Sequence, residues 1–219
     1  MNRTGKAYEM EPVAIDIEVA IHSENIIGES PVWCPETEQL YLVDISGQKI
    51  HFFRPADGTY RTFSLPDWVT SLSTREKGGL VLSMRKTFAF YDPDTDHLEV
   101  LADPEPDRPG NRFNDGKCDR QGRLWAGTMG AKDWLSDSGA LYRFEPDQTI
   151  TRMQDHVKCS NGTGWSPDSR TMYYTESFRY GIFAYDFDPA NGEIENRRPF
   201  VTLDPEGNGV PDGLTVDAE

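Results

Sequence analysis

The sequence is poor in cysteine and lacks long apolar runs. Its three cysteines are odd in number and show no C-x-x-C spacing, which argues against a disulfide framework and against the common zinc and redox motifs. We therefore expect Cys34, Cys118 and Cys159 to be free thiols in a reducing compartment. No run of 18 apolar residues occurs, and the first residues lack the apolar region of a signal peptide. These absences predict a cytoplasmic protein without a membrane partner.

Basic residues are also scarce relative to acidic ones. The 219 residues include 22 Lys and Arg against 37 Asp and Glu, which gives a formal net charge of -15. Such a charge repels phosphate backbones, so nucleic acid is not an expected partner. The acidic excess suits a site that binds a cation, although an ordinary solvated acidic surface is the commoner explanation. The sequence has four histidines and no G-x-S-x-G motif, so nothing indicates Ser-His-Asp catalysis.

The hydrophobic pattern indicates strands and no helices. Residues 1–11 are polar and are expected to form a flexible leader, followed by a single domain over 12–219. Alternating apolar residues from Val13 to Ile21 predict a half-buried strand. A short apolar strand then recurs every 39 to 48 residues, and a turn proline recurs with it. The strands are 41–43, 80–82, 124–126 and 172–174, and the prolines are Pro55, Pro93, Pro146 and Pro189.

A repeat of this length, built of strands and turns, is typical of an all-β protein with the blades of a β-propeller. A β-sandwich with regularly spaced turns is the alternative, because turn spacing alone does not separate the two folds. Leu214 to Asp217 has the character of a further inner strand.

Four polar motifs follow one another along the chain. The richest is R-x-N-D-G-K-x-D-x-x-G-R-x-W-x-G-T-M, which begins at Arg112. The others are Gly28-Glu29-Ser30-Pro31-Val32-Trp33, Ser160-Asn161-Gly162-Thr163-Gly164-Trp165-Ser166-Pro167-Asp168 and Pro211-Asp212-Gly213-Leu214. In content and order they resemble the motifs of the SMP-30/gluconolactonase/regucalcin family. The resemblance implies a six-bladed β-propeller, of which this sequence would stop in the fifth blade and so be C-terminally incomplete.

The resemblance also implies one divalent metal ion on the propeller axis, bound by Glu29, Asn161 and Asp212. Two carboxylates and an amide oxygen suit Ca²⁺, Mg²⁺ or Mn²⁺, and Zn²⁺ also accepts such ligands. Each residue lies next to a strand-like run, so a radial arrangement of blades would bring the three together. Taken singly, the two Gly-containing pairs are ordinary turn signals and Glu29 is an ordinary solvated residue.

The implied activity is hydrolysis of a small-molecule sugar lactone to the free acid, with Asp212 as general base. Arg112 and Asn114 match substrate-contacting positions of the family. Lys132 occupies a position where animal members carry a glutamate, so as a substrate-binding residue it would change which substrate hydroxyls are recognised. The alternative is that Lys132 points into solvent, as lysines beside acidic loops commonly do. Asp115 is interpreted as part of an Asn-Asp-Gly turn rather than as a catalytic residue.

Two other functions are compatible with the same residues. One is a phosphotriesterase-like propeller, since a metal ion can also polarise a P=O bond. The other is a non-catalytic calcium-binding propeller. A monomer or a small homo-oligomer is expected.

Overall fold

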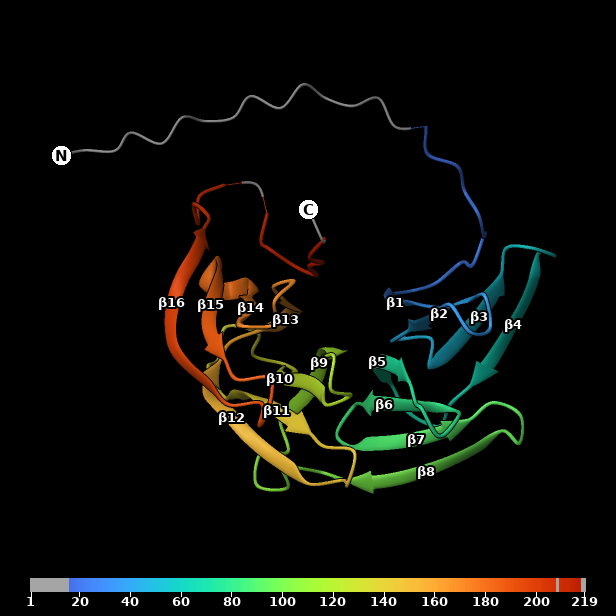
Figure 1. The fold of residues 1–219 in the computed structure, drawn as a ribbon, viewed down its shortest axis with the longest axis horizontal. Coiled ribbons are helices and arrows are strands. Elements are labelled where there is room, and N and C mark those ends of the chain that lie inside the picture. The colour runs from blue at the N-terminus through green and yellow to red at the C-terminus, as the bar shows by residue number, and fades with distance from the viewer. Residues whose placement is uncertain (1–15, 208, 218–219) are drawn as a thin grey trace.

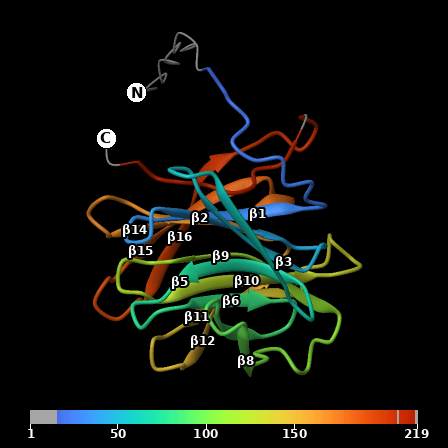
Figure 2. The same ribbon diagram turned by 90° about the vertical axis from the view of Figure 1, so that its right-hand side faces the viewer.

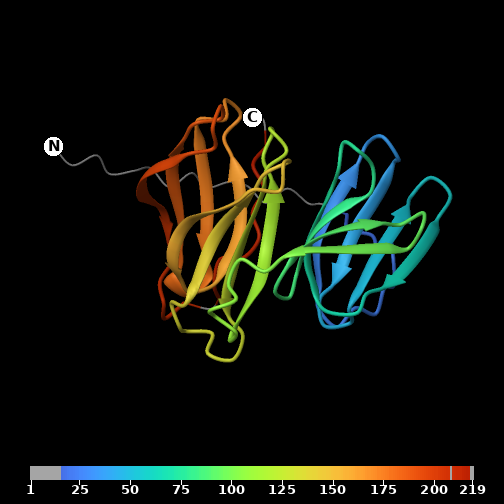
Figure 3. The ribbon, with the colours of Figure 1, turned by 90° about the horizontal axis from the view of Figure 1, so that it is seen from below.

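The computed structural model describes residues 16–207 and 209–217. Four antiparallel sheets of four strands each stand side by side around a common centre, as the blades of a β-propeller (Figure 1). Within each blade the strands pair in sequence order, so that the first strand lies nearest the centre and the fourth lies at the outside. Figure 3 shows the first two blades in blue to green beside the last two in yellow-green to red.

The strand bounds follow the same scheme in all four blades. Blade 1 contains β1 (Gly28–Cys34), β2 (Gln39–Asp44), β3 (Lys49–Arg54) and β4 (Thr59–Ser64). Blade 2 contains β5 (Val69–Thr74), β6 (Leu80–Met84), β7 (Phe88–Asp92) and β8 (His97–Ala102). Blade 3 contains β9 (Asn111–Cys118), β10 (Leu124–Gly130), β11 (Gly139–Phe144) and β12 (Ile150–Val157). Blade 4 contains β13 (Ser160–Trp165), β14 (Thr171–Glu176), a short 3₁₀ helix η1 (Ser177–Arg179), β15 (Gly181–Phe187) and β16 (Ile194–Thr202).

The predicted repeat is confirmed. The four short apolar strands of the sequence are the second strands β2, β6, β10 and β14, and each of the four prolines lies in the turn between a third and a fourth strand. The four sheets also separate this fold from the two facing sheets of a sandwich.

The hydrophobic core lies between neighbouring blades. Because successive side chains of a strand point to opposite faces, Leu124 and Ala126 pack toward blade 2 while Trp125 packs toward blade 4. Phe88 of blade 2 stacks on Phe144 of blade 3 with their ring centroids 4.8 Å apart. Each blade therefore needs its neighbours to bury both faces. The fourth strands of the first and last described blades, β4 and β16, are mostly exposed.

Two strand predictions are wrong. Val13–Ala14–Ile15 lie outside the described residues, but 16–21 form no strand, and the segment 16–27 leads away from the sheets (Figure 2). Ile17 and Val19 are 89% and 69% exposed, because no neighbouring strand pairs with their alternating pattern. Leu214 to Asp217 lies beside β13 without strand pairing.

Other predictions concern the termini, the cysteines and the membrane. Residues 1–11, the predicted leader, lie outside the described residues. All three cysteines are free, as predicted. In the described part of the chain, no helix has the length and apolar character needed to cross a bilayer.

Candidate metal-binding site at the inner strands

The first strand of every blade contains a β-bulge in its first half. In β1 the shift lies between Glu29 and Val32, in β5 between Val69 and Ser71, and in β13 between Ser160 and Thr163. In β9 it accompanies Asn114 and Asp115. A bulge places one extra residue against the partner strand and redirects its side chain, a device common beside active sites. The bulges therefore present polar residues of three blades at one end of the inner strands.

Blade 2 has the same bulge but offers no charged group there. Its extra residue, Thr70, is buried. The Thr70 hydroxyl donates a 3.1 Å hydrogen bond to the carbonyl oxygen of Ser83, and its oxygen lies 2.8 Å from the hydroxyl oxygen of Ser83. The propeller geometry is thus shared by all four blades, whereas the chemistry depends on what each blade carries at this position.

A backbone hydrogen bond joins the chain segments that carry two of the three predicted metal ligands. The backbone amide of Gly162, next to Asn161 in β13, donates a 3.2 Å hydrogen bond to the carbonyl oxygen of Asp212. Gly162 permits this approach, since a Cβ there would lie 2.4 Å from the backbone nitrogen of Leu214. Asn161 is 8% exposed, while the side chain of Asp212 is exposed.

The third predicted ligand, Glu29, interacts electrostatically with Asp212. Desolvation raises the pKa of the exposed Glu29 in β1, and the negative charges of Asp212 and Asp115 raise it further. Burial likewise raises the pKa of Asp115, with a smaller contribution from Asp212. Carboxylates from β1, β9 and the 210–217 segment thus share one electrostatic environment.

The turn interpretation of Asp115 is wrong. The Asn-Asp-Gly triplet lies inside β9, and its carboxylate accepts a 2.7 Å hydrogen bond from the amide of Gly116. The triplet forms a bulge rather than a hairpin turn because β10 pairs along β9 on both sides of it. Sequence reasoning missed Asp115 as a site residue; its only signal was its place inside the densest polar motif.

The two predicted substrate-contacting residues of β9 hold each other in place. Arg112 donates a 2.7 Å hydrogen bond to the Asn114 amide oxygen, and Asn114 donates one of 2.8 Å to the carbonyl oxygen of Ser160. This leaves Asn114 one N–H and one lone pair for a ligand. Burial lowers the pKa of Arg112, and within residues 16–207 and 209–217 no carboxylate forms an ion pair with it. Lys132 is exposed in the loop between β10 and β11.

The donor set fits a hard cation. The charge of Asp212 raises the pKa of both Glu29 and Asp115, so these carboxylates create a negative region that a cation would stabilise, and all the donors are oxygens. The residues that the structure describes contain no group of three or more His, Cys, Asp or Glu side chains placed to hold a metal ion. The predicted set has only two such side chains, since its third ligand is the amide of Asn161.

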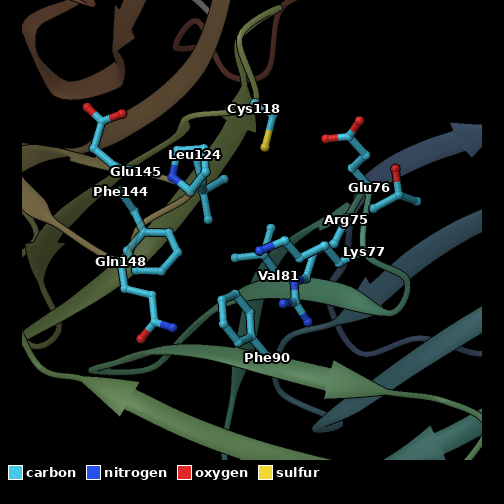
Figure 4. A pocket seen from close by; sticks show the side chains of 13 residues that line it. Arg75, Glu76, Lys77, Val81, Phe90, Cys118, Leu124, Phe144, Glu145 and Gln148 are labelled. Atoms are coloured by element: carbon cyan, nitrogen blue, oxygen red, sulfur yellow. The ribbon is translucent and has the colours of Figure 1, made fainter.

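A separate cavity lies at the other end of the inner strands. Its volume is about 190 Å³, and Thr74 and Cys118, the last residues of β5 and β9, are among its lining residues. Arg75 covers its aromatic wall, with the guanidinium carbon 3.5 Å from the ring centroid of Phe90 (Figure 4). None of the predicted site residues lines this cavity, so it is distinct from the candidate site.

Residues 27–219 match the family model described as the SMP-30/Gluconolactonase/LRE-like region. The chain belongs to this family. It is 37% identical over 210 residues to regucalcin of Xenopus laevis, which covers 94% of this chain and 70% of that protein. It is 34% identical over 203 residues to the Bacillus subtilis (strain 168) protein named "Putative sugar lactone lactonase YvrE", covering 93% of this chain and 69% of that one.

Solved structures agree with this membership. A luciferin-regenerating enzyme superposes with a TM-score of 0.83 at 31% identity, over 88% of this chain and 66% of the other. A calcium-binding protein from Agrobacterium tumefaciens, regucalcin, superposes with a TM-score of 0.86 at 25% identity, over 92% of this chain and 68% of the other. The chain thus spans between about two thirds and 70% of these relatives.

Proposed function

We propose that this protein is a metal-dependent hydrolase that opens a sugar-acid lactone to the free acid. The observation that supports the proposal is that Glu29 and Asn161 lie at bulges of the inner strands β1 and β13, while Asp212 accepts a backbone hydrogen bond from Gly162 and its charge raises the pKa of Glu29. Membership of a family whose relatives include a protein named as a lactonase supports the substrate class. Aldonolactones such as gluconolactone or a pentonolactone are the proposed substrates.

Each residue has a role in this proposal. Glu29, Asn161 and Asp212 would hold one divalent ion, Ca²⁺, Mg²⁺, Mn²⁺ or Zn²⁺, which when bound polarises the lactone carbonyl. The exposed carboxylate of Asp212 accepts a proton from the attacking water. Arg112 has no carboxylate partner in the described part of the chain, so its guanidinium can donate hydrogen bonds to the lactone oxygens. The remaining N–H of Asn114 can bind a ring hydroxyl. The exposed Lys132 would contact only the outer part of a substrate.

The test measures lactone opening by acid release in a pH-indicator assay, across a set of aldonolactones and the four divalent ions. We expect turnover that EDTA abolishes and that the matching ion restores. Asp212→Asn should remove turnover while far-UV circular dichroism remains that of a β protein. Full activity in the presence of EDTA, or in Asp212→Asn, would refute the proposal.

A second candidate is a calcium-binding propeller without catalysis, favoured by the description of the Agrobacterium tumefaciens relative as a calcium-binding protein. Ion binding at Glu29, Asn161 and Asp212 with every lactone inert would support it. The six-bladed ring implied by the family resemblance also remains a proposal, since the described residues form four blades.

A further inference from the structure

Ser177 lies between two of the proposed metal ligands and contacts both of their chain segments. It is the first residue of η1, directly after β14, and is 2% exposed. Its Oγ lies 2.8 Å from Nδ2 of Asn161 and 2.6 Å from the carbonyl oxygen of Pro211. Pro211 immediately precedes Asp212. One hydroxyl therefore joins β13 to the segment 210–217.

The direction of these two hydrogen bonds follows from counting hydrogens. The carbonyl oxygen of Pro211 can only accept, so the single hydroxyl hydrogen of Ser177 is donated to it. The serine oxygen can then only accept from Asn161, and the group facing it has to be the amide N–H₂. An amide turned the other way would place its oxygen against an oxygen that has no hydrogen left to donate.

This arrangement sets which end of the Asn161 amide faces away from Ser177. Its nitrogen is further held by a 3.8 Å contact to the sulfur of Cys159. Among the residues that the structure describes, none donates a hydrogen bond to its Oδ1. The amide oxygen, the atom a hard cation requires, is thus left available while the nitrogen is held.

The same hydroxyl also anchors the segment that carries Asp212. Its bond to the carbonyl oxygen of Pro211 precedes the Gly162–Asp212 backbone bond by one peptide unit, so the backbone is held on both sides of the Asp212 Cα. Polar groups that orient metal ligands in this way typically contribute 10-fold to 100-fold to metal affinity.

We propose that Ser177 is a positioning residue of the metal site, which orients the Asn161 amide oxygen toward the ion and holds Asp212 beside it. The inference rests on the proposed function only in that Asn161 and Asp212 are taken as the ligands. Ser177 itself does not touch substrate or ion.

The experiment compares wild type, Ser177→Ala, Ser177→Thr and Ser83→Ala. Ser83 is a matched control because it is a fully buried serine whose hydroxyl bonds within the blade 2 cluster, where no proposed ligand lies. Ca²⁺ and Mn²⁺ affinities are measured by isothermal titration calorimetry. Hydrogen exchange of residues 212–216 is measured in the metal-free proteins. We expect Ser177→Ala to weaken ion binding 10-fold to 100-fold and to speed exchange in this segment, while Ser83→Ala changes neither and Ser177→Thr, which keeps the hydroxyl, restores both.

Two results would overturn the positioning role: ion affinity of Ser177→Ala within threefold of wild type, or an equal loss in Ser83→Ala. Unchanged hydrogen exchange in metal-free Ser177→Ala would overturn the anchoring of the Asp212 segment. If wild type binds no ion but Ser177→Ala still speeds exchange, the anchoring is supported and the proposed function is the part that fails. Circular dichroism of each variant identifies any general loss of folding. If Ser177→Ala does not fold, ion affinity and hydrogen exchange are compared between Ser177→Thr and wild type.

Discussion

The ammonium group of Lys117 donates a 2.8 Å hydrogen bond to the carbonyl oxygen of Leu214, which joins β9 to a segment 97 residues further along the chain. Leu214 follows Asp212 by two residues. Burial lowers the pKa of Lys117, and the negative charge of Asp115 opposes that shift. The segment 210–217 is thereby fixed against two inner strands, through Lys117 on β9 and through Gly162 on β13.

Replacing Lys117 by methionine should loosen this segment, because the side chain keeps its length but loses its donor. We expect faster hydrogen exchange of residues 212–216 and a weaker affinity for Ca²⁺. Lys86→Met is the control, since Lys86 also donates to a backbone carbonyl, that of Arg108, at 2.9 Å, but away from the proposed ligands. Equal effects of the two substitutions would contradict a specific role for Lys117.

Gly162→Ala should displace the residues around Asp212. The added Cβ would lie 2.4 Å from the nitrogen of Leu214 and 2.8 Å from the carbonyl oxygen of Asp212. Overpacking of this kind costs about 1–3 kcal/mol, and here the backbone that moves carries a proposed ligand. Calorimetry should show weaker ion binding than in Gly110→Ala, whose Cβ would meet nothing within 4 Å. Wild-type affinity in Gly162→Ala would show that the segment can shift without cost to the site.

Arg112→Ala should raise KM for the lactone about tenfold or more, since a charged hydrogen bond contributes about 1.5–3 kcal/mol. Part of this loss is indirect, because Arg112 also holds the amide oxygen of Asn114. Steady-state kinetics on wild type, Arg112→Ala and Arg120→Ala separate the loss of a substrate contact from a general effect of removing an arginine. Arg120 bonds to the backbone of Ser166 and Pro167 at an exposed turn, so its loss should leave KM unchanged. An unchanged KM in Arg112→Ala would remove Arg112 from the substrate site.

We expect the ion pair between Asp155 and Arg108 to make the free energy of unfolding depend on pH. Arg108 donates two hydrogen bonds to its carboxylate, at 2.8 Å and 3.1 Å, and these hold the pKa of Asp155 well below its ordinary value. A lowered folded-state pKa stabilises the protein above the ordinary aspartate pKa, and this contribution is lost as the pH falls toward the folded value. Urea unfolding should therefore show Asp155→Asn less stable than wild type at pH 7, with the difference shrinking by pH 3. A difference that stays constant with pH would exclude this ion pair as its source.

The blades were predictable from sequence because their signals are local. Apolar second strands and turn prolines recur at a steady spacing, and each blade is formed from one continuous run of chain. The Val13–Ile21 prediction failed for 16–21 because alternation specifies a strand only where another strand is available for pairing.

The site was predictable only in part. Glu29, Asn161 and Asp212 came from motif resemblance, and the structure brings them into one region. Asp115, Lys117 and Ser177 could not be assigned in the same way. Asp115 depends on a bulge that resembles a turn in sequence, and Lys117 and Ser177 depend on contacts with a segment far away along the chain.

The pairing of strands in sequence order bears on how the polypeptide is synthesised. Each sheet can complete its hydrogen bonds from residues that leave the ribosome one after another. The next blade can then pack against the apolar face of the finished blade during translation. The contacts of Ser177 and Lys117 with the 210–217 segment form only after all four sheets have emerged. The segment that carries the proposed ligand Asp212 therefore reaches its place only after these four sheets have been synthesised.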